Sequence, residues 1–128
     1  MRKMTTRAAL ATAVSIPLLM SAPALAGEAG TFTGASNHIT TGGVSIVETS
    51  AGKVVLLAAD FSLDGAPDPR VGLGKDGKYD EATDMGELRS INGLQAYAVP
   101  DGVDVSGYNE VYIWCRKFSV PLGVASLD

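Results

Sequence analysis

The side chains able to do redox or nucleophilic chemistry are few in this chain. Cys115 is its only cysteine and His38 its only histidine. A cysteine nucleophile needs a base to take its proton, and that base needs a third group to orient it. His38 is therefore the first polar neighbour to consider for the Cys115 thiol, although only the fold can bring the two residues together.

The neighbours of Cys115 support two environments for its thiol. Arg116 and Lys117 follow it directly, and their positive charges would favour the thiolate if the side chain were exposed. Alternation along a strand instead places Cys115 on one face with Val111 and Ile113, where it would behave as a small apolar residue. The pattern favours the buried environment. An unpaired cysteine in an oxidising compartment is inert, bonded to another molecule, or used chemically.

The supply of ligands excludes most metal centres. Blue copper needs two histidines and a cysteine, structural zinc needs four Cys or His ligands, and c-type haem needs Cys-x-x-Cys-His. One Cys, one His and Met85 cannot supply any of these sets. No complete motif encodes a cofactor, so its identity is unknown, and a single axial haem ligand from His38 or Met85 stays open. Without a nucleophile elbow or a phosphate-binding glycine loop, a stand-alone enzyme is not expected.

Acidic loop residues form a weaker candidate site. Asp60, Asp64 and Asp68 could gather the oxygen ligands that hard cations prefer, whereas solvated loop acids are the simpler interpretation. An EF-hand frame on residues 72–83 fails, because its first and third positions are glycines and its twelfth is a threonine. Asp60 and Asp68 remain as possible binding residues.

The first 26 residues fit a secretory signal peptide. A cationic start between Arg2 and Arg7 precedes an apolar run over 8–20, and the small-x-small sequence Ala24-Leu25-Ala26 precedes Gly27. The apolar run is shorter than the roughly 20 residues that a membrane span needs. We therefore expect export to the periplasm or the exterior, with no transmembrane anchor after cleavage.

The predicted mature chain, residues 27–128, is one acidic domain. The whole chain carries 10 Lys and Arg against 14 Asp and Glu, and cleavage of the predicted signal peptide would remove the basic Arg2, Lys3 and Arg7 but no acidic residue. A negative domain repels phosphate backbones, so nucleic-acid binding is not expected. With a single cysteine it has no internal disulfide, and its stability must come from its core.

The most strand-like segment is Tyr108–Pro121, which contains Cys115 and the only tryptophan, Trp114. Alternation places Tyr112, Trp114, Arg116 and Phe118 on the face opposite Cys115. Because both faces are largely apolar, a central strand of a sandwich or barrel is predicted. The aromatic side chains could stack on a ligand, but more often such residues fill a core.

Short strands separated by turn signals are predicted along the rest of the domain. Residues 53–61 form a continuous apolar run, predicted as a strand buried on both faces, with a short helix as the alternative. Loops are predicted over 64–69 and 74–83, and one helical turn within 104–109. The other predicted strands cover 31–33, 44–48, 70–73, 87–89, 94–99 and 122–127. The pattern indicates an all-β, single-domain antiparallel β-sandwich or barrel of short strands.

The segment 111–120, with its Trp-Cys-x-x-Phe core, resembles the C-terminal signature of the DM-thirteen domain family. That family occurs beside DOMON domains in Skeletor-type proteins and alone in exported bacterial proteins. The resemblance covers about residues 30 to 127. Its other matches are Phe32-Thr33-Gly34, His38, Gly42, Asp60-Phe61, Pro67-Asp68, Val71, Leu73, Gly86, Leu88, Asn92-Gly93, Tyr97, Val99-Pro100, Val103-Asp104 and Tyr108.

The resemblance implies an all-β fold and an electron-transfer role centred on Cys115, with Trp114, Arg116 and His38 as its possible neighbours. Because no DOMON or cytochrome domain accompanies it here, the second redox centre would lie on a partner protein. The alternative is a non-catalytic binding or adhesion module outside the cytoplasm, contacting a cell-surface protein partner or a cation through its loops, with Cys115 serving only as a packing residue.

Overall fold

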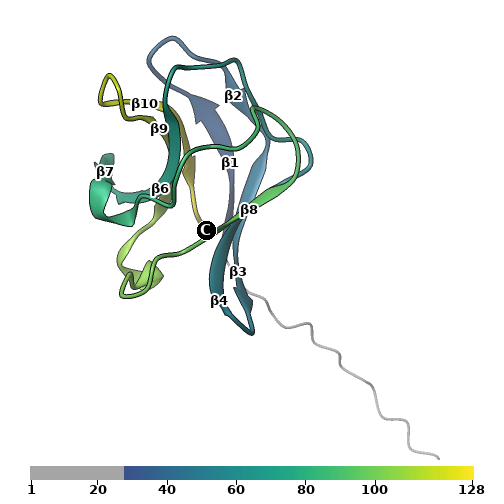
Figure 1. The fold of residues 1–128 in the computed structure, drawn as a ribbon, viewed down its shortest axis with the longest axis vertical. Helices are drawn as coiled ribbons and strands as arrows, with labels where there is room; N and C mark the ends of the chain where they lie inside the picture. Colours follow the sequence, from purple (N-terminus) through teal and green to yellow (C-terminus); the bar gives the residue numbers. More distant parts are fainter. Residues whose placement is uncertain (1–27) are drawn as a thin grey trace, which may run out of the picture.

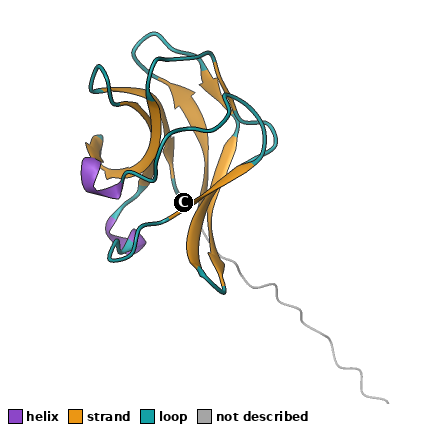
Figure 2. Cartoon of the chain, viewed as in Figure 1, coloured by secondary structure: helices purple, strands orange, loops and turns teal. Residues whose placement is uncertain are grey.

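A computed structural model describes residues 28–128, so the predicted signal peptide lies outside the described residues. Eight strands form one antiparallel sheet in the order β7-β6-β9-β10-β1-β3-β4-β8, which curls into a half-barrel (Figure 1). A separate pair, β2 and β5, lies at one end of the molecule. The predicted all-β fold is confirmed, and Figure 2 shows strands throughout, with short helical turns beside the β7 side of the sheet.

The strand and helix bounds are as follows. The elements are β1 (Ala29–Gly34), β2 (Thr40–Thr41), β3 (Gly43–Thr49), β4 (Gly52–Leu57), β5 (Ser62–Leu63), β6 (Pro69–Lys75), β7 (Lys78–Asp80), the 3₁₀ helix η1 (Glu81–Thr83), β8 (Gln95–Ala98), the 3₁₀ helix η2 (Val105–Gly107), β9 (Glu110–Cys115) and β10 (Val120–Ser126). Neither helix of the described part is long and apolar enough to cross a membrane.

The segment 108–121 is a hairpin, which corrects the prediction of one continuous strand. β9 ends at Cys115, residues 116–119 turn with Ser119 at φ 55°, and β10 returns antiparallel. Phe118 lies in this turn and is 61% exposed, so it does not share a strand face with Trp114. β9 itself is an inner strand, flanked by β6 and β10, as the two apolar faces predicted.

The segment 74–83 is a second hairpin, where the sequence predicted a loop. Asp76 and Gly77 both have positive φ, 50° and 88°, which is the pattern of a two-residue turn matched to strand twist. The turn pairs β6 with β7 in the register Gly74 opposite Tyr79. The sequence prediction treated this segment as a loop because it is charged, and it did not use the turn signal of Asp76-Gly77.

The apolar run 53–61 forms a strand, not a helix, but only one of its faces is fully buried. In β4, Val55 and Leu57 are buried while Val54 and Leu56 are partly exposed. The chain leaves the sheet after Leu57, because Ala58 and Phe61 close a turn by a backbone hydrogen bond. An open half-barrel leaves part of its outer surface in contact with water, and that explains the one-sided burial.

The core fills the inside of the half-barrel with apolar side chains from most strands. β9 contributes Val111, Ile113 and Cys115 to it, and β6 contributes Val71 and Leu73. The strand predicted over 94–99 is confirmed as β8, in which Tyr97 is buried between exposed neighbours. The segment 87–89 is not a strand; it makes one isolated bridge, between Glu87 and Arg70.

Candidate functional site

Cys115 lies at the end of β9, where it pairs with Pro69 of β6 and Val120 of β10. Its thiol is free and only 1% of the residue surface is exposed. The side chain belongs to the apolar core. The buried environment that alternation favoured is therefore confirmed, and the adjacent Arg116 is exposed as the first residue of the turn 116–119.

His38 contacts a carboxylate rather than the thiol. Its Nδ1 lies 2.8 Å from Oδ1 of Asp64, whose Oδ2 accepts a hydrogen bond from the Ile39 backbone N–H. These two bonds hold the pKa of Asp64 below its usual range, the bond to His38 contributing most. A group that orients the histidine is thus present, but among residues 28–128 no hydrogen bond joins His38 to Cys115.

The three candidate loop acids have separate partners. Asp60 accepts a hydrogen bond from the Gly43 backbone, Asp64 binds His38, and Asp68 lies 4.0 Å from the Arg70 Nε. In the described part of the chain, no three acidic, histidine or cysteine side chains gather in a way that could hold a metal ion.

An aromatic cluster covers the face of β9 opposite Cys115. We give this name to Tyr79, Tyr112 and Trp114. The Tyr79 and Trp114 rings stack at 13° with centroids 4.4 Å apart. Tyr112 meets Tyr79 at 5.5 Å and Trp114 at 6.3 Å in tilted geometries. Such offset and edge contacts are the arrangements that aromatic rings prefer.

Two glycines of β6 make room for this cluster. A Cβ on Gly72 would lie 2.6 Å from Cε1 of Tyr79, and a Cβ on Gly74 would overlap the Tyr112 ring. In the sheet register, Gly72 lies opposite Tyr112 and Gly74 opposite Tyr79. The Tyr79 and Tyr112 rings therefore pack directly against the β6 backbone, because Gly72 and Gly74 carry no side chains.

The aromatic cluster opens onto a small pocket of about 270 Å³, lined by Tyr79, Glu81, Asp84, Trp114 and Arg116. Asp84 also pairs with Arg70, whose Nε lies 3.3 Å from Oδ2 of Asp84. Two of the predicted neighbours of Cys115, Trp114 and Arg116, thus come together here, on the other side of the strand from the thiol.

The phenols of the cluster are held neutral. Burial is the main cause that raises the pKa of Tyr79, and it raises the pKa of Tyr112 to about 12. The Tyr79 hydroxyl is buried and has no hydrogen-bond partner among the described residues. The sequence prediction missed Tyr79; the Asp76-Gly77 turn was the signal that could have placed it on a strand.

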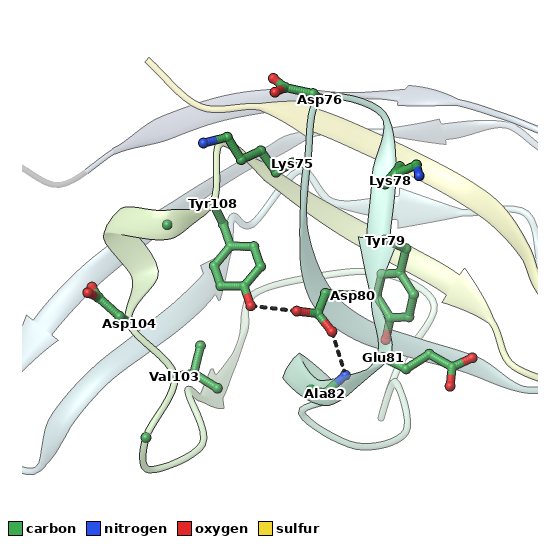
Figure 3. A pocket seen from close by; sticks show the side chains of 12 residues that line it. Lys75, Asp76, Lys78, Tyr79, Asp80, Glu81, Ala82, Val103, Asp104 and Tyr108 are labelled. Carbon is green, nitrogen blue, oxygen red and sulfur yellow. Dashed lines mark hydrogen bonds between the residues drawn. The ribbon is translucent and has the colours of Figure 1, made fainter.

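A larger groove of about 940 Å³ lies between the β6–β7 hairpin and the segment 102–108 (Figure 3). Across it the Tyr108 hydroxyl donates to Oδ2 of Asp80 at 2.6 Å, and Oδ1 of Asp80 accepts from the Ala82 backbone at 2.9 Å. These bonds lower the pKa of Asp80. Lys75 and Lys78 lie at the rim together with acidic side chains, so the groove carries charges of both signs.

Comparison with known proteins gives one family. The family model described as "Electron transfer DM13" matches residues 31–127, which includes every strand from β2 to β10 and most of β1. No curated protein and no solved structure matches the chain. Because the match spans nearly all of the described residues, and because the all-β fold and the Trp114-Cys115 segment agree with the resemblance seen in the sequence, the chain belongs to the electron-transfer DM13 family.

Proposed function

We propose that this protein is an exported electron-transfer domain in which Cys115 is the redox group and a partner protein carries the other redox centre. The observation that carries the proposal is the free thiol of the only cysteine, held at the end of an inner strand within the segment that matches the family. The N-terminal sequence supports export to the periplasm or the exterior.

The burial of Cys115 favours one-electron transfer over thiol–disulfide exchange. Thiol–disulfide exchange requires a thiolate to reach a sulfur atom directly, and the chain has no second cysteine to resolve a mixed disulfide. At 1% exposure, direct attack is blocked in the folded state. One-electron transfer needs no such contact. The thiol loses one electron and one proton to become a thiyl radical, the partner's oxidised centre takes the electron and water takes the proton, and the reverse step restores the thiol.

The direct test is one-electron oxidation of the folded mature domain. A photogenerated ruthenium(III) tris-bipyridine complex serves as oxidant, and electron paramagnetic resonance of rapidly frozen samples detects a sulfur radical without contact with the buried atom. We expect a sulfur-centred radical signal in the native protein and none in the Cys115→Ser variant. Equal oxidation of both proteins, with no sulfur-centred signal, would contradict the redox role of Cys115.

A spectrum of protein purified from its own export compartment tests whether Cys115 holds a prosthetic group. Visible absorbance that disappears in Cys115→Ser would identify such a group. A colourless protein whose thiol stays inert toward the one-electron oxidant would favour the second function below.

The groove beside the β6–β7 hairpin favours a second candidate, a binding or adhesion module in which Cys115 only packs. Its volume of about 940 Å³ and its charges of both signs suit a polar partner segment. Cation assistance is tested by the melting temperature of the mature domain with and without calcium. A ligand specific for the folded state raises that temperature, so an unchanged value would remove the cation from this function.

A further inference from the structure

We propose that electrons enter and leave the domain through Trp114, stacked on Tyr79, at the small pocket lined by Arg116. This inference rests on the proposed function and deepens it by naming the face that a redox partner must approach. It concerns the aromatic cluster, which the resemblance to the family does not assign.

The first observation is the position of Trp114 relative to the thiol. The two residues are adjacent in β9 and project to opposite faces, so one peptide unit of backbone separates their side chains. Cys115 is enclosed by the core, whereas Trp114 is partly exposed and lines the pocket of about 270 Å³. The indole is therefore the oxidisable group next to Cys115 that an outside partner can reach.

The second observation is the chemistry of the stacked pair. Thiol, phenol and indole are the side-chain groups whose one-electron oxidations lie close together in energy. An indole can lose an electron and remain protonated as a radical cation, while a phenol must also lose its proton. Among residues 28–128, the Tyr79 hydroxyl has no hydrogen-bond partner to receive a proton, and burial raises its pKa. Trp114 is thus the relay, and Tyr79 is a positioning residue.

Tyr79 also stabilises the charge that forms on Trp114. Its ring lies parallel to the indole at 4.4 Å, and the face of an aromatic ring attracts a positive charge. The charged side chains around the pocket offset one another: Arg70 pairs with Asp84, and Arg116 and Glu81 contribute opposite signs. Ring stacking, rather than a local net charge, therefore stabilises the radical cation.

In the proposed transfer, one electron moves from Cys115 through Trp114 to the partner. A one-electron oxidant at the pocket, such as an oxidised metal centre of the partner, takes one electron from the indole of Trp114. The Cys115 thiol then supplies one electron to the indole. Because Cys115 directly precedes the exposed turn 116–119, its proton passes to water when this turn opens. The indole is restored, and the domain holds a thiyl radical until a reductant returns one electron and water returns the proton.

Flash oxidation with photogenerated ruthenium(III) tris-bipyridine follows both radicals in time, because the indole radical absorbs visible light and electron paramagnetic resonance of samples frozen at successive times reports the sulfur radical. In the native domain we expect the indole radical first and the sulfur radical as it decays. In Trp114→Phe the sulfur radical should form at least about tenfold more slowly, which is a barrier increase of at least about 1.4 kcal/mol. Trp114→Tyr, which restores an oxidisable ring, should recover part of the rate.

Trp114 is the only tryptophan, so growth with a multiply fluorinated tryptophan alters this side chain alone and nearly preserves its shape. The fluorinated ring is harder to oxidise, and it should slow sulfur-radical formation even if Trp114→Phe fails to fold. Tyr97→Phe is the matched control, because it removes a phenol buried elsewhere in the core, and it should leave the rate unchanged.

The outcomes separate this inference from the proposed function. A longer-lived indole radical in Cys115→Ser would support both. Sulfur-radical formation at the native rate with fluorinated Trp114 would overturn the path through the indole and leave Cys115 as the redox group. An indole radical in the native domain that decays without any sulfur radical would overturn the redox role of Cys115 itself.

Discussion

The two faces of β9 differ in what covers them. The inner face carries Val111, Ile113 and Cys115, which pack in the common core of the half-barrel. The outer face carries Tyr112 and Trp114, which are covered locally by a ring from the β6–β7 hairpin. One strand thus contributes to a large aliphatic core on one side and to a small aromatic cluster on the other.

The two faces of β9 therefore differ in how much they contribute to the stability of the domain and in how accessible they are to solvent. Many strands share the inner face, so changes there affect the whole domain, and a thiol placed there is isolated from water. The outer face is covered only by the three-residue strand β7, and two glycines leave space for its aromatic rings. Because this cover is small, the outer face lies near the surface and lines a pocket. The sharpest tests of this contrast change one face and leave the other intact.

The largest expected contrast is chemical access to adjacent residues. Cys115 should react with a soluble thiol reagent at least about a thousandfold more slowly in the native domain than in denaturant, because reaction needs an opening of the core. Trp114 fluorescence should meanwhile be quenched by acrylamide in the native domain. A thiol that reacts at the denatured rate in folded protein would abolish the distinction between the two faces.

Truncation of the inner face comes next. Ile113→Ala removes a fully buried side chain and should lower the free energy of unfolding by roughly 2–5 kcal/mol, measured by denaturant titration. Ile91→Ala is the control, since Ile91 is about half exposed and its loss should change that free energy by no more than about 0.5 kcal/mol. Similar losses in the two variants would show that the inner face is not the main core.

A methyl group added beneath the aromatic cluster should have a smaller effect. Gly72→Ala pushes a Cβ against Tyr79 and should lower the free energy of unfolding by roughly 1–3 kcal/mol. Gly107→Ala, where a Cβ meets nothing within 4 Å, is the matched control. Tyr79→Leu combined with Gly72→Ala should recover part of the loss; simple additivity of the two changes would mean that the ring and the glycine are not coupled.

The smallest expected effect concerns the hydrogen bond between the Tyr108 hydroxyl and Asp80, which joins the segment before β9 to β7. The Tyr108 hydroxyl, more than any other group, lowers the folded-state pKa of Asp80, so this contribution to stability is present above the unfolded pKa of about 3.9 and is lost as the pH falls through the folded value. Tyr108→Phe should therefore lower the melting temperature slightly at neutral pH and not in strong acid. An equal decrease at both pH values would indicate lost packing instead.

Alternation and turn signals in the sequence were sufficient to predict several local features. The strands predicted within 44–48, 53–61 and 94–99, the burial of Cys115, and a helical turn within 104–109 are all confirmed. These features depend on residues close in sequence, whose faces follow from the two-residue period of a strand. The same period failed at 116–119, because a chain that turns no longer alternates between two faces of a sheet.

The candidate site depended on contacts that the sequence could not reveal. β7 contains Lys78, Tyr79 and Asp80, too few residues to show a periodic pattern, and its ring reaches Trp114 only because β6 pairs with both β7 and β9. His38 likewise finds Asp64 through the packing of two loops.

The sequence by itself determined an all-β domain with one thiol, one indole beside it, and a resemblance to an electron-transfer family. Alternation also indicated that the thiol faces the core, but only the tertiary structure decided that the indole on the other face lines a pocket, stacked on Tyr79. The physical reason is that a strand specifies which side chains share a face, whereas the partners that cover each face come from distant segments joined by sheet pairing.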